Sequence, residues 1–528
     1  MVLIVNPYFL TLAAWLFNGA KGFDVRIPVE APPNSHSIPA DFASLSIELD
    51  GWLEWVGKTS RNDFFYNALE NIVQISGVPP RIRVGGKTQD RAYWSGSTEI
   101  ADVIYPVANS SIPYPEALRV NVGDGFYRAC NFLPNNTRVT HGLNFASADS
   151  LRGVYHLNSI LNAYLSPSFL EAKIRLEAVE IGHEPDLYLE NRYPQPYTAS
   201  KYVSEWSTWA GNVLDYIPQF HPDIVEYGLK FWAGSLSASS HSSTGFSPES
   251  LFKEGLLTKT SAGPAISSFS QHHYNGNICA GSDQDLQDVL AKHYIRSNLS
   301  VFAPDIAITR AQGLEYVLGE IGTFTTRASG VSDVAGSAIW ALDYLLHASH
   351  LGVSRVFFHQ GIGYRSNIAQ PVALPRSPSD GKQLDTPLLP YIQPQYYATI
   401  IAAEAIGPGV NTRISELVVD HPALSAYAFY SEKSLTRVLF INSRVYLRKN
   451  GRRKSIRVDL DFMGRRPRRA TVKRLSIASA DDTSNLRWGG VTYETESGRP
   501  AGTEESIPVR LERSFEIRDT EVALISFV

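Results

Sequence analysis

The segment Arg175–Tyr188 reads RLEAVEIGHEPDLY, and it brings a carboxyl group to the end of a buried strand. Its first half is typical of a strand, whereas the prolines and tyrosines after Glu184 are typical of a loop. A glutamate at the exit of such a strand is either a helix cap or a residue with a chemical role. The fold around the segment decides between the two.

Seven other segments repeat this strand pattern, and helical patterns separate them. The eight candidate strands cover residues 42–49, 80–86, 138–145, 175–182, 229–235, 266–274, 314–322 and 354–361. The candidate helices cover residues 63–76, 151–165, 200–217, 248–257, 285–297, 335–352 and 395–407. Strands that alternate with helices in this way predict a (β/α)8 barrel over residues 41–407. In such barrels, active sites lie at the carboxyl ends of the strands.

A different pattern begins after residue 407. Runs with a period of two and no intervening helices predict an antiparallel β-sandwich over residues 408–528. The extended residues 21–32 are expected to add a strand to it, so that residues 21–40 belong to this second domain. Residues 374–390 are rich in proline and are predicted to form a long loop over the barrel mouth. The runs cover residues 424–431, 435–443, 455–462, 470–476 and 521–528.

Composition sets a few limits on function. The formal net charge of −4 over 528 residues gives no reason to expect a nucleic-acid partner. The first 20 residues are apolar and predict a signal peptide, while no other segment could cross a membrane. Three sequons agree with a secreted glycoprotein, and the two cysteines leave a single bridge open. The sequence leaves the oligomeric state open. The sequons begin at Asn109, Asn135 and Asn298, and the cysteines are Cys130 and Cys279.

Two glutamates are expected to face each other in the barrel mouth. Glu184 follows the fourth candidate strand and Glu320 ends the seventh. Either one alone would more often be a helix cap or a surface ion pair, but the pair at these two positions favours glycoside hydrolysis. In that reaction one carboxyl protonates the leaving oxygen and the other attacks the anomeric carbon, and retaining enzymes hold the two about 5 Å apart.

The motifs at these strand ends resemble glycoside hydrolase family 79. EIGHEPDLY is similar to the Asn-Glu-Pro acid/base motif of retaining glycosidases that are built on (β/α)8 barrels. The motifs that carry the resemblance are RVGGKTQD at 83–90, IGHEPDLY at 181–188, QHHY at 271–274, LGE at 318–320 and SRVFFHQGIGY at 354–364. The family contains β-glucuronidases and heparanase-like enzymes, and its fungal secreted branch is the most similar. The resemblance runs from about residue 41 to the C terminus.

The resemblance implies a function and a set of roles. It implies a secreted, retaining, exo-acting β-glucuronidase that releases terminal glucuronic or 4-O-methylglucuronic acid and needs no metal or cofactor. Glu184 would be the acid/base and Glu320 the nucleophile. The hydroxyl of Tyr274 would hold the carboxylate of the nucleophile, while Tyr364 and the loop of residues 323–330 would bind the carboxylate of the substrate.

His183 departs from the motif, which has an asparagine at this position. The asparagine amide donates to the sugar 2-OH, a contact that strengthens in the transition state. Histidine also donates, but it is larger and can become charged, and a protonated ring would lower the pKa of Glu184. Two alternatives therefore stay open, namely a carbohydrate-binding protein with impaired catalysis and a β-glycosidase for a neutral sugar.

For the other polar residues, a structural role is an alternative to a functional one. Glu48, at the exit of the first strand, either accepts hydrogen bonds from sugar hydroxyls or forms a structural ion pair. Gln89 and Asp90 are expected to line the mouth beside a tight turn at two glycines. His347 and His350 are expected to be solvated or capping residues rather than zinc ligands. The basic residues between 444 and 474 are expected to form a solvated face.

Overall fold

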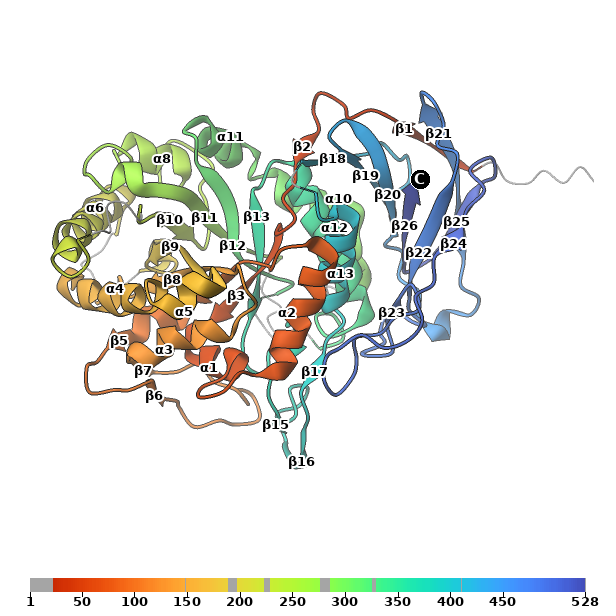
Figure 1. Ribbon diagram of the computed structural model, residues 1–528. Helices are drawn as coiled ribbons and strands as arrows, with labels where there is room; N and C mark the ends of the chain where they lie inside the picture. The colour runs from red at the N-terminus through yellow and green to blue at the C-terminus, as the bar shows by residue number, and fades with distance from the viewer. Residues whose placement is uncertain are drawn as a thin grey trace, which may run out of the picture.

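The computed structural model describes residues 22–147, 149–188, 197–222, 228–275, 285–324, 329–409 and 411–527. Figure 1 shows a barrel surrounded by helices next to a separate β domain. The predicted signal peptide and Cys279 lie outside the described residues, whereas Cys130 is a buried free thiol. Among the described residues, no helix has the length and apolar character that crossing a membrane requires.

Eight parallel strands close into the predicted barrel, and each candidate segment overlaps one of them. Their order around the barrel is β10-β11-β12-β13-β3-β4-β8-β9. A barrel of eight strands has an interior that side chains fill. The strands are β3 (Ala43–Glu48), β4 (Ile82–Gly85), β8 (Arg138–Leu143), β9 (Arg175–Ile181), β10 (Phe231–Leu236), β11 (Ile266–Tyr274), β12 (Glu315–Gly322) and β13 (Arg355–Gln360).

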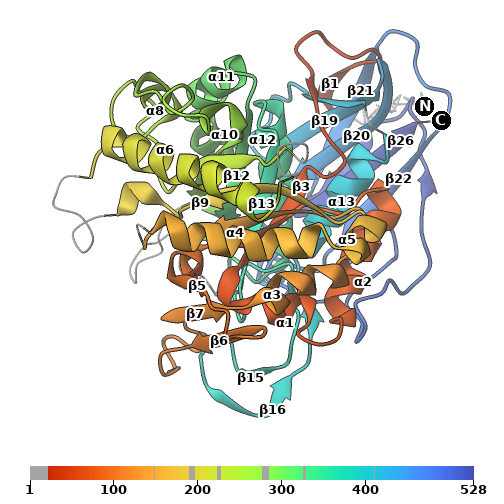
Figure 2. The same ribbon diagram turned by 60° about the vertical axis from the view of Figure 1, so that its left-hand side comes forward.

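The helices cover the outside of the barrel, as the turned view in Figure 2 shows. Helix α2 (Asp63–Ser76) matches its prediction, because the Asn62 side chain caps its N terminus and Gly77, in the left-handed conformation, ends it. The other predicted helices are α4 (Ser150–Tyr164), α6 (Ala199–Tyr216), α8 (Pro248–Lys253), α12 (Ala335–His350) and α13 (Tyr396–Ile406). Shorter helices are α1 (Trp52–Val56), α3 (Asp124–Arg128) and α5 (Pro167–Ala172).

One predicted helix is divided and another was not predicted. The segment predicted as a single helix over residues 285–297 forms α9 (Leu286–Leu290) and α10 (Lys292–Ser300), because Ala291 between them has extended backbone with a ψ of 123°. Helix α11 (Ala303–Ala311) follows directly, with a proline in its first turn.

Two insertions at the barrel mouth also differ from the prediction. After β4 the chain forms a small sheet of β5 (Ala92–Trp94), β7 (Arg119–Val122) and β6 (Ala101–Ile104). The predicted loop over residues 374–390 is instead an antiparallel hairpin of β15 (Leu374–Arg376) and β16 (Gln383–Leu388). Its turn closes at Gly381, which has a φ of 69°. The hairpin projects at the bottom of Figure 1.

The C-terminal domain is the predicted sandwich. Its large sheet has the order β2-β18-β19-β20-β26-β22-β23, and its small sheet has the order β1-β21-β25. The expected strand from the N-terminal segment is β1 (Phe23–Pro28), which pairs in parallel with β21 (Ser455–Met463). The other strands are β2 (His36–Ser37), β18 (Thr412–Glu416), β19 (Leu424–Ser431), β20 (Ser434–Asn442), β22 (Ala470–Ser476), β23 (Arg487–Trp488), β25 (Phe515–Arg518) and β26 (Glu521–Phe527).

Arg296 on α10 connects the two domains. Its guanidinium lies 2.6 Å from Asp343 on α12 and 2.7 Å from Glu416 on β18. The other oxygen of Glu416 accepts from His347 Nδ1 at 2.7 Å, so the prediction of a solvated or capping residue is wrong for His347, which is buried between the domains. Burial would raise the pKa of Glu416, but His347 and Arg296 lower it to about 2.

Removal of the Arg296 charge should therefore weaken the whole molecule. Arg296→Met should lower the free energy of unfolding by ~3–5 kcal/mol, because Asp343 and Glu416 would stay buried without their cation. Arg128→Met is the matched control, since Arg128 pairs with Asp124 on the surface and should change stability by about 1 kcal/mol or less. Urea unfolding of both variants measures the difference. Equal midpoints for the two variants would contradict the bridging role of Arg296.

Candidate active site

Glu184 enters the barrel mouth from the end of β9 in an unusual backbone conformation. Its φ of 47° and ψ of 56° are left-handed, although Pro185 follows it. Such strain in a residue other than glycine persists only where the surroundings hold it, and it is concentrated at functional sites. Here the Glu184 N–H donates to the Ser235 carbonyl at 2.9 Å. The carboxyl oxygen Oε1 lies 3.0 Å from Nδ1 of His272.

Glu320 lies across the mouth on β12 and is held through both oxygens. Oε1 accepts from the Tyr274 hydroxyl at 2.7 Å, the contact that the resemblance implies. Oε2 accepts from Arg83 Nη1 at 2.8 Å. The buried Arg83 guanidinium also donates from Nε to Glu180 at 2.6 Å. These bonds restrict the Glu320 carboxylate to one orientation.

The two glutamates are close enough to act on one bond. One oxygen from Glu184 and Glu320 and one ring nitrogen from His183 and His272 all lie within 4.8 Å of one another. This spacing agrees with the roughly 5 Å of a retaining glycosidase. The same four residues offer metal-type donors, but Arg83 already supplies the positive charge at Glu320, so a cation there would be repelled.

Their surroundings push the two carboxyl groups toward opposite protonation states. Burial raises the pKa of Glu184 above its ordinary value. Burial would also raise the pKa of Glu320, but the cationic ring of His359 and the Arg83 guanidinium hold it well below its usual range. A protonated Glu184 beside an ionised Glu320 is the combination that an acid and a nucleophile need.

His183 lies between the two carboxyl groups. Its Nε2 is 3.6 Å from Glu184 and its Nδ1 is 3.9 Å from Glu320. Burial lowers the pKa of the ring more than the carboxylates raise it, so the ring is neutral at ordinary pH. Of the two charge states that the sequence allows for His183, the neutral one is therefore favoured. Because Arg83 Nη2 lies 3.4 Å from Nδ1, Nδ1 is the acceptor and Nε2 carries the hydrogen.

Glu48 is engaged by the protein itself. Oε1 accepts from the Thr88 N–H at 2.7 Å, and Oε2 lies 3.1 Å from His359 Nε2. Burial would lower the pKa of His359, but Glu320 and Glu48 raise it. A Cβ on Gly86 would come within 2.3 Å of the Glu48 carboxylate, so only glycine fits there. The contacts favour the ion-pair alternative for Glu48, whose side chain still borders the active-site cavity.

A cavity of about 790 Å³ unites the predicted residues. We call it the active-site cavity. Gln89 and Asp90 do not line it, because Gln89 is buried against Arg83 and Asp90 accepts from the Tyr188 hydroxyl. This expectation is wrong. Phe324 and Ser332 do line the cavity, whereas residues 325–328 of the predicted carboxylate loop lie outside the described residues. The predicted residues that border it are Glu48, His183, Glu184, Tyr274, Glu320 and Tyr364.

Sequence reasoning missed three residues that organise the site. Arg83 lies in the second strand, His272 in the sixth and His359 in the eighth, and all three are buried. Charged residues inside apolar strand segments are rare without a partner. This signal could have identified Arg83 from its sequence position. The two histidines of QHHY do alternate as the strand period requires, since His272 contacts Glu184 and His273 contacts Tyr344 on the outside.

Known proteins share this architecture. Residues 426–524 match the model of the glycosyl hydrolase family 79 C-terminal beta domain. A beta-glucuronidase of Neurospora crassa is 26% identical over 520 residues, which cover 90% of this chain and 89% of the relative. A beta-glucuronidase of Aspergillus niger is 28% identical over 428 residues, which cover 78% of this chain and 73% of the relative.

Solved structures agree on the fold. A 4-O-α-L-rhamnosyl-β-D-glucuronidase from Fusarium oxysporum superposes with a TM-score of 0.77 at 22% identity, over 96% of this chain and 100% of that one. A family 51 α-L-arabinofuranosidase from Thermotoga petrophila superposes with a TM-score of 0.58 at 14% identity, over 96% of this chain and 100% of that one. The domain match and the alignments over most of the chain confirm the predicted resemblance to glycoside hydrolase family 79.

Proposed function

We propose that this chain is a retaining β-glucuronidase with Glu184 as acid/base and Glu320 as nucleophile. The observation that carries the proposal is the close pair of carboxyl groups within 4.8 Å, whose pKa values are shifted in opposite directions. The two curated relatives are both beta-glucuronidases. A binding protein with impaired catalysis is not favoured, because every part of a two-carboxylate site is present.

The reaction proceeds in two displacements at the anomeric carbon. Ionised Glu320 attacks this carbon while Glu184 gives its proton to the leaving oxygen, which forms a glycosyl ester and frees the aglycone. Glu184, now ionised, then takes a proton from water, which attacks the same carbon and releases Glu320. Arg83 and Tyr274 keep the Glu320 carboxylate oriented for attack through their bonds to its two oxygens.

Substrate recognition follows from the residues around this pair. The Nε2–H of His183 is available to the sugar 2-OH, in the place of the usual asparagine amide. Tyr364 and the cations Lys87, Arg91 and Arg365 border the cavity that would hold the carboxylate of a uronic acid. These cations favour a uronic acid over a neutral sugar, because they attract an anion.

Secretion is part of the proposal. It is supported by the apolar N-terminal segment and by the exposed side chains of Asn109 and Asn135 in two of the three sequons. Glycosylated Asn109 or Asn135 in the secreted protein would carry bulky glycans on the surface without disturbing the core.

The glutamate pair is tested by two substitutions. Glu320→Gln should reduce kcat by roughly 10⁴-fold or more, since it removes the nucleophile. Glu184→Ala should harm substrates with poor leaving groups most, and azide should restore part of its rate and give a β-glycosyl azide. Glu315→Gln, at the other end of β12, is the matched control and should keep wild-type activity on an aryl β-glucuronide. Near wild-type rates for both site variants would refute the assignment.

The hydrogen bond from Tyr274 should be visible in the pH dependence. Tyr274→Phe removes a donor to ionised Glu320, so the pKa of that carboxyl should rise and the acid limb of kcat/KM should move to higher pH. We expect kcat to fall by about 10- to 100-fold. Tyr316→Phe is the matched control, because the buried Tyr316 hydroxyl has no hydrogen-bond partner in the described part of the chain. Identical profiles for the two variants would contradict the role.

Sugar preference is tested with a pair of aryl glycosides. The β-glucuronide should be hydrolysed with a kcat/KM about 100-fold or more above that of the β-glucoside, because loss of the carboxylate leaves polar partners in the cavity unpaired. Steady-state kinetics with the same leaving group on both sugars measure the ratio. Equal values would favour the neutral-sugar alternative.

A further inference from the structure

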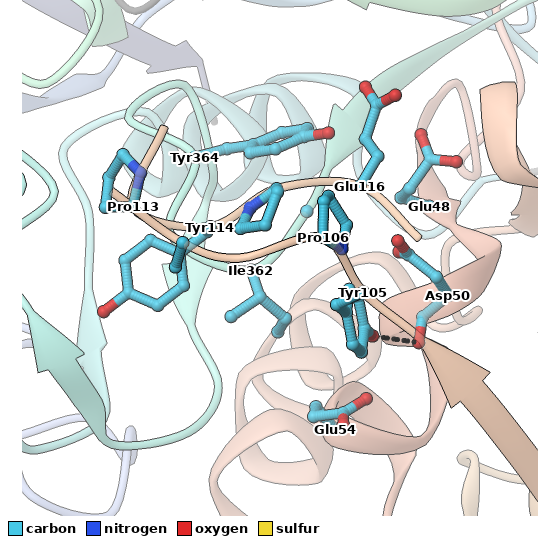
Figure 3. A pocket seen from close by; sticks show the side chains of 13 residues that line it. Glu48, Asp50, Glu54, Tyr105, Pro106, Pro113, Tyr114, Glu116, Ile362 and Tyr364 are labelled. Atoms are coloured by element: carbon cyan, nitrogen blue, oxygen red, sulfur yellow. Dashed lines mark hydrogen bonds between the residues drawn. The ribbon is translucent and has the colours of Figure 1, made fainter. Parts of the chain in front are cut away.

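A second cavity of about 310 Å³ opens beside the active-site cavity (Figure 3). We call it the side cavity. Its walls come from the β6–β7 connection between residues 105 and 116 and from residues 361–364 after β13. Glu48, Glu116 and Tyr364 border both cavities, so the two are continuous. Nothing in the proposed reaction uses the side cavity.

The side cavity lies across the barrel from the acid/base residue. Glu184 follows β9, whereas Glu48 ends β3 and Tyr364 follows β13. In the closed order of the strands, β13 is four steps from β9 in either direction, which is the opposite side. A molecule that bridges the two sides would therefore extend from Glu184 over Glu320 toward the side cavity.

This direction defines which part of the substrate reaches the side cavity. The acid/base residue must contact the oxygen of the leaving group, so the leaving group lies on the β9 side. The uronic acid extends the opposite way. In a pyranose ring, O4 lies across from the anomeric carbon. A substituent on O4 would thus point toward Glu48, Tyr364 and the side cavity.

We propose that the side cavity is a subsite for one neutral sugar unit attached to O4 of the uronic acid, and that the enzyme releases this disaccharide intact. The inference rests on the proposed function and names its substrate class. A 4-O-methyl group would fill only a small part of the space. The volume lies at the lower end of the roughly 300–1,000 Å³ typical of small-molecule sites, which suits a single ring.

The walls have the chemistry of a sugar site. Tyr105, Tyr114 and Ile362 offer aromatic and apolar surfaces to the C–H face of a pyranose, and they surround the opening in Figure 3. The carboxyl groups of Asp50 and Glu54 also line the side cavity and can accept hydrogen bonds from sugar hydroxyls. Burial raises the pKa of Asp50 to about 8, so this group also has a hydrogen to donate at ordinary pH.

The same carboxyl groups restrict the occupant. Glu48, Asp50, Glu54 and Glu116 border the side cavity, whereas none of its lining side chains is a lysine or an arginine. A second uronic acid would bring its own carboxylate into a cavity that offers it no cation and that is bordered by the ionised carboxylate of Glu48, so its binding would be disfavoured. The occupant is therefore neutral, and the cations Lys87, Arg91 and Arg365 border only the active-site cavity.

The experiment compares 4-nitrophenyl β-D-glucuronide with the same compound carrying a rhamnosyl or glucosyl unit on O4. At least one O4-substituted substrate should have a kcat/KM tenfold or more above that of the unsubstituted one, and mass spectrometry should find the intact disaccharide. A ratio of one or less for both, with the unsubstituted glucuronide still cleaved, overturns the subsite alone. If none of the three compounds is cleaved, both the proposed function and the subsite are refuted.

Two substitutions locate the effect. Ile362→Trp should fill the side cavity. Tyr105→Ala should remove one aromatic wall, at a surface position that tolerates change. Each substitution should lower the ratio of substituted to unsubstituted kcat/KM by about tenfold. Tyr216→Ala on α6 is the matched control, since Tyr216 and Tyr105 are 45% and 44% exposed. Its ratio should equal that of the wild type. An unchanged ratio in both cavity variants overturns the assignment of the subsite to this cavity.

Discussion

The active site depends on one buried cation. Arg83 has no exposed side-chain surface and neutralises Glu180 and Glu320 at once. A guanidinium buried in this way is costly unless every partner is in place. Its fork geometry therefore fixes the positions of β4, β9 and β12 relative to one another at the depth where the chemistry occurs. The orientation of Glu320 and the acceptor role of His183 Nδ1 both follow from this arrangement.

A second ionic pair supports the first from β13 and β3, the strands between β12 and β4. His359 lies 3.1 Å from Glu48 and 3.6 Å from Glu320. Glu48 is in turn oriented by Thr88, which follows a glycine pair that leaves room for the carboxylate. Two cationic groups thus face Glu320 and lower its pKa, whereas the pKa of Glu184 is raised mainly by burial. The opposite pKa shifts of the two glutamates therefore depend on residues at the ends of several strands of the barrel and not on either glutamate alone.

Periodicity predicted the barrel and the sandwich, and strand-end chemistry predicted the pair of Glu184 and Glu320, because each depends on local apolar patterns or on where a strand stops. The roles of His183, Tyr274 and Tyr364 were implied by the resemblance to a known family. Three features could not be predicted in this way. The sheet of β5, β7 and β6 consists of strands of only three or four residues, too short to show a clear period, and its stability comes from tertiary contacts. The hairpin at residues 374–390 is rich in proline, which resembles a loop. The burial of His347 depends on Glu416, which lies 69 residues later in another domain.

The position of the β5–β7–β6 insertion has an evolutionary consequence. The segment between its strands β6 and β7 lines both cavities. The insertion is attached to the barrel only between β4 and β8, and it contributes no group to the glutamate pair. Loops that a rigid scaffold carries tolerate insertions and replacement better than the scaffold itself. Related chains could therefore acquire new glycan preferences by exchanging this one insertion, while the ionic framework beneath it, and with it the chemistry, is inherited unchanged.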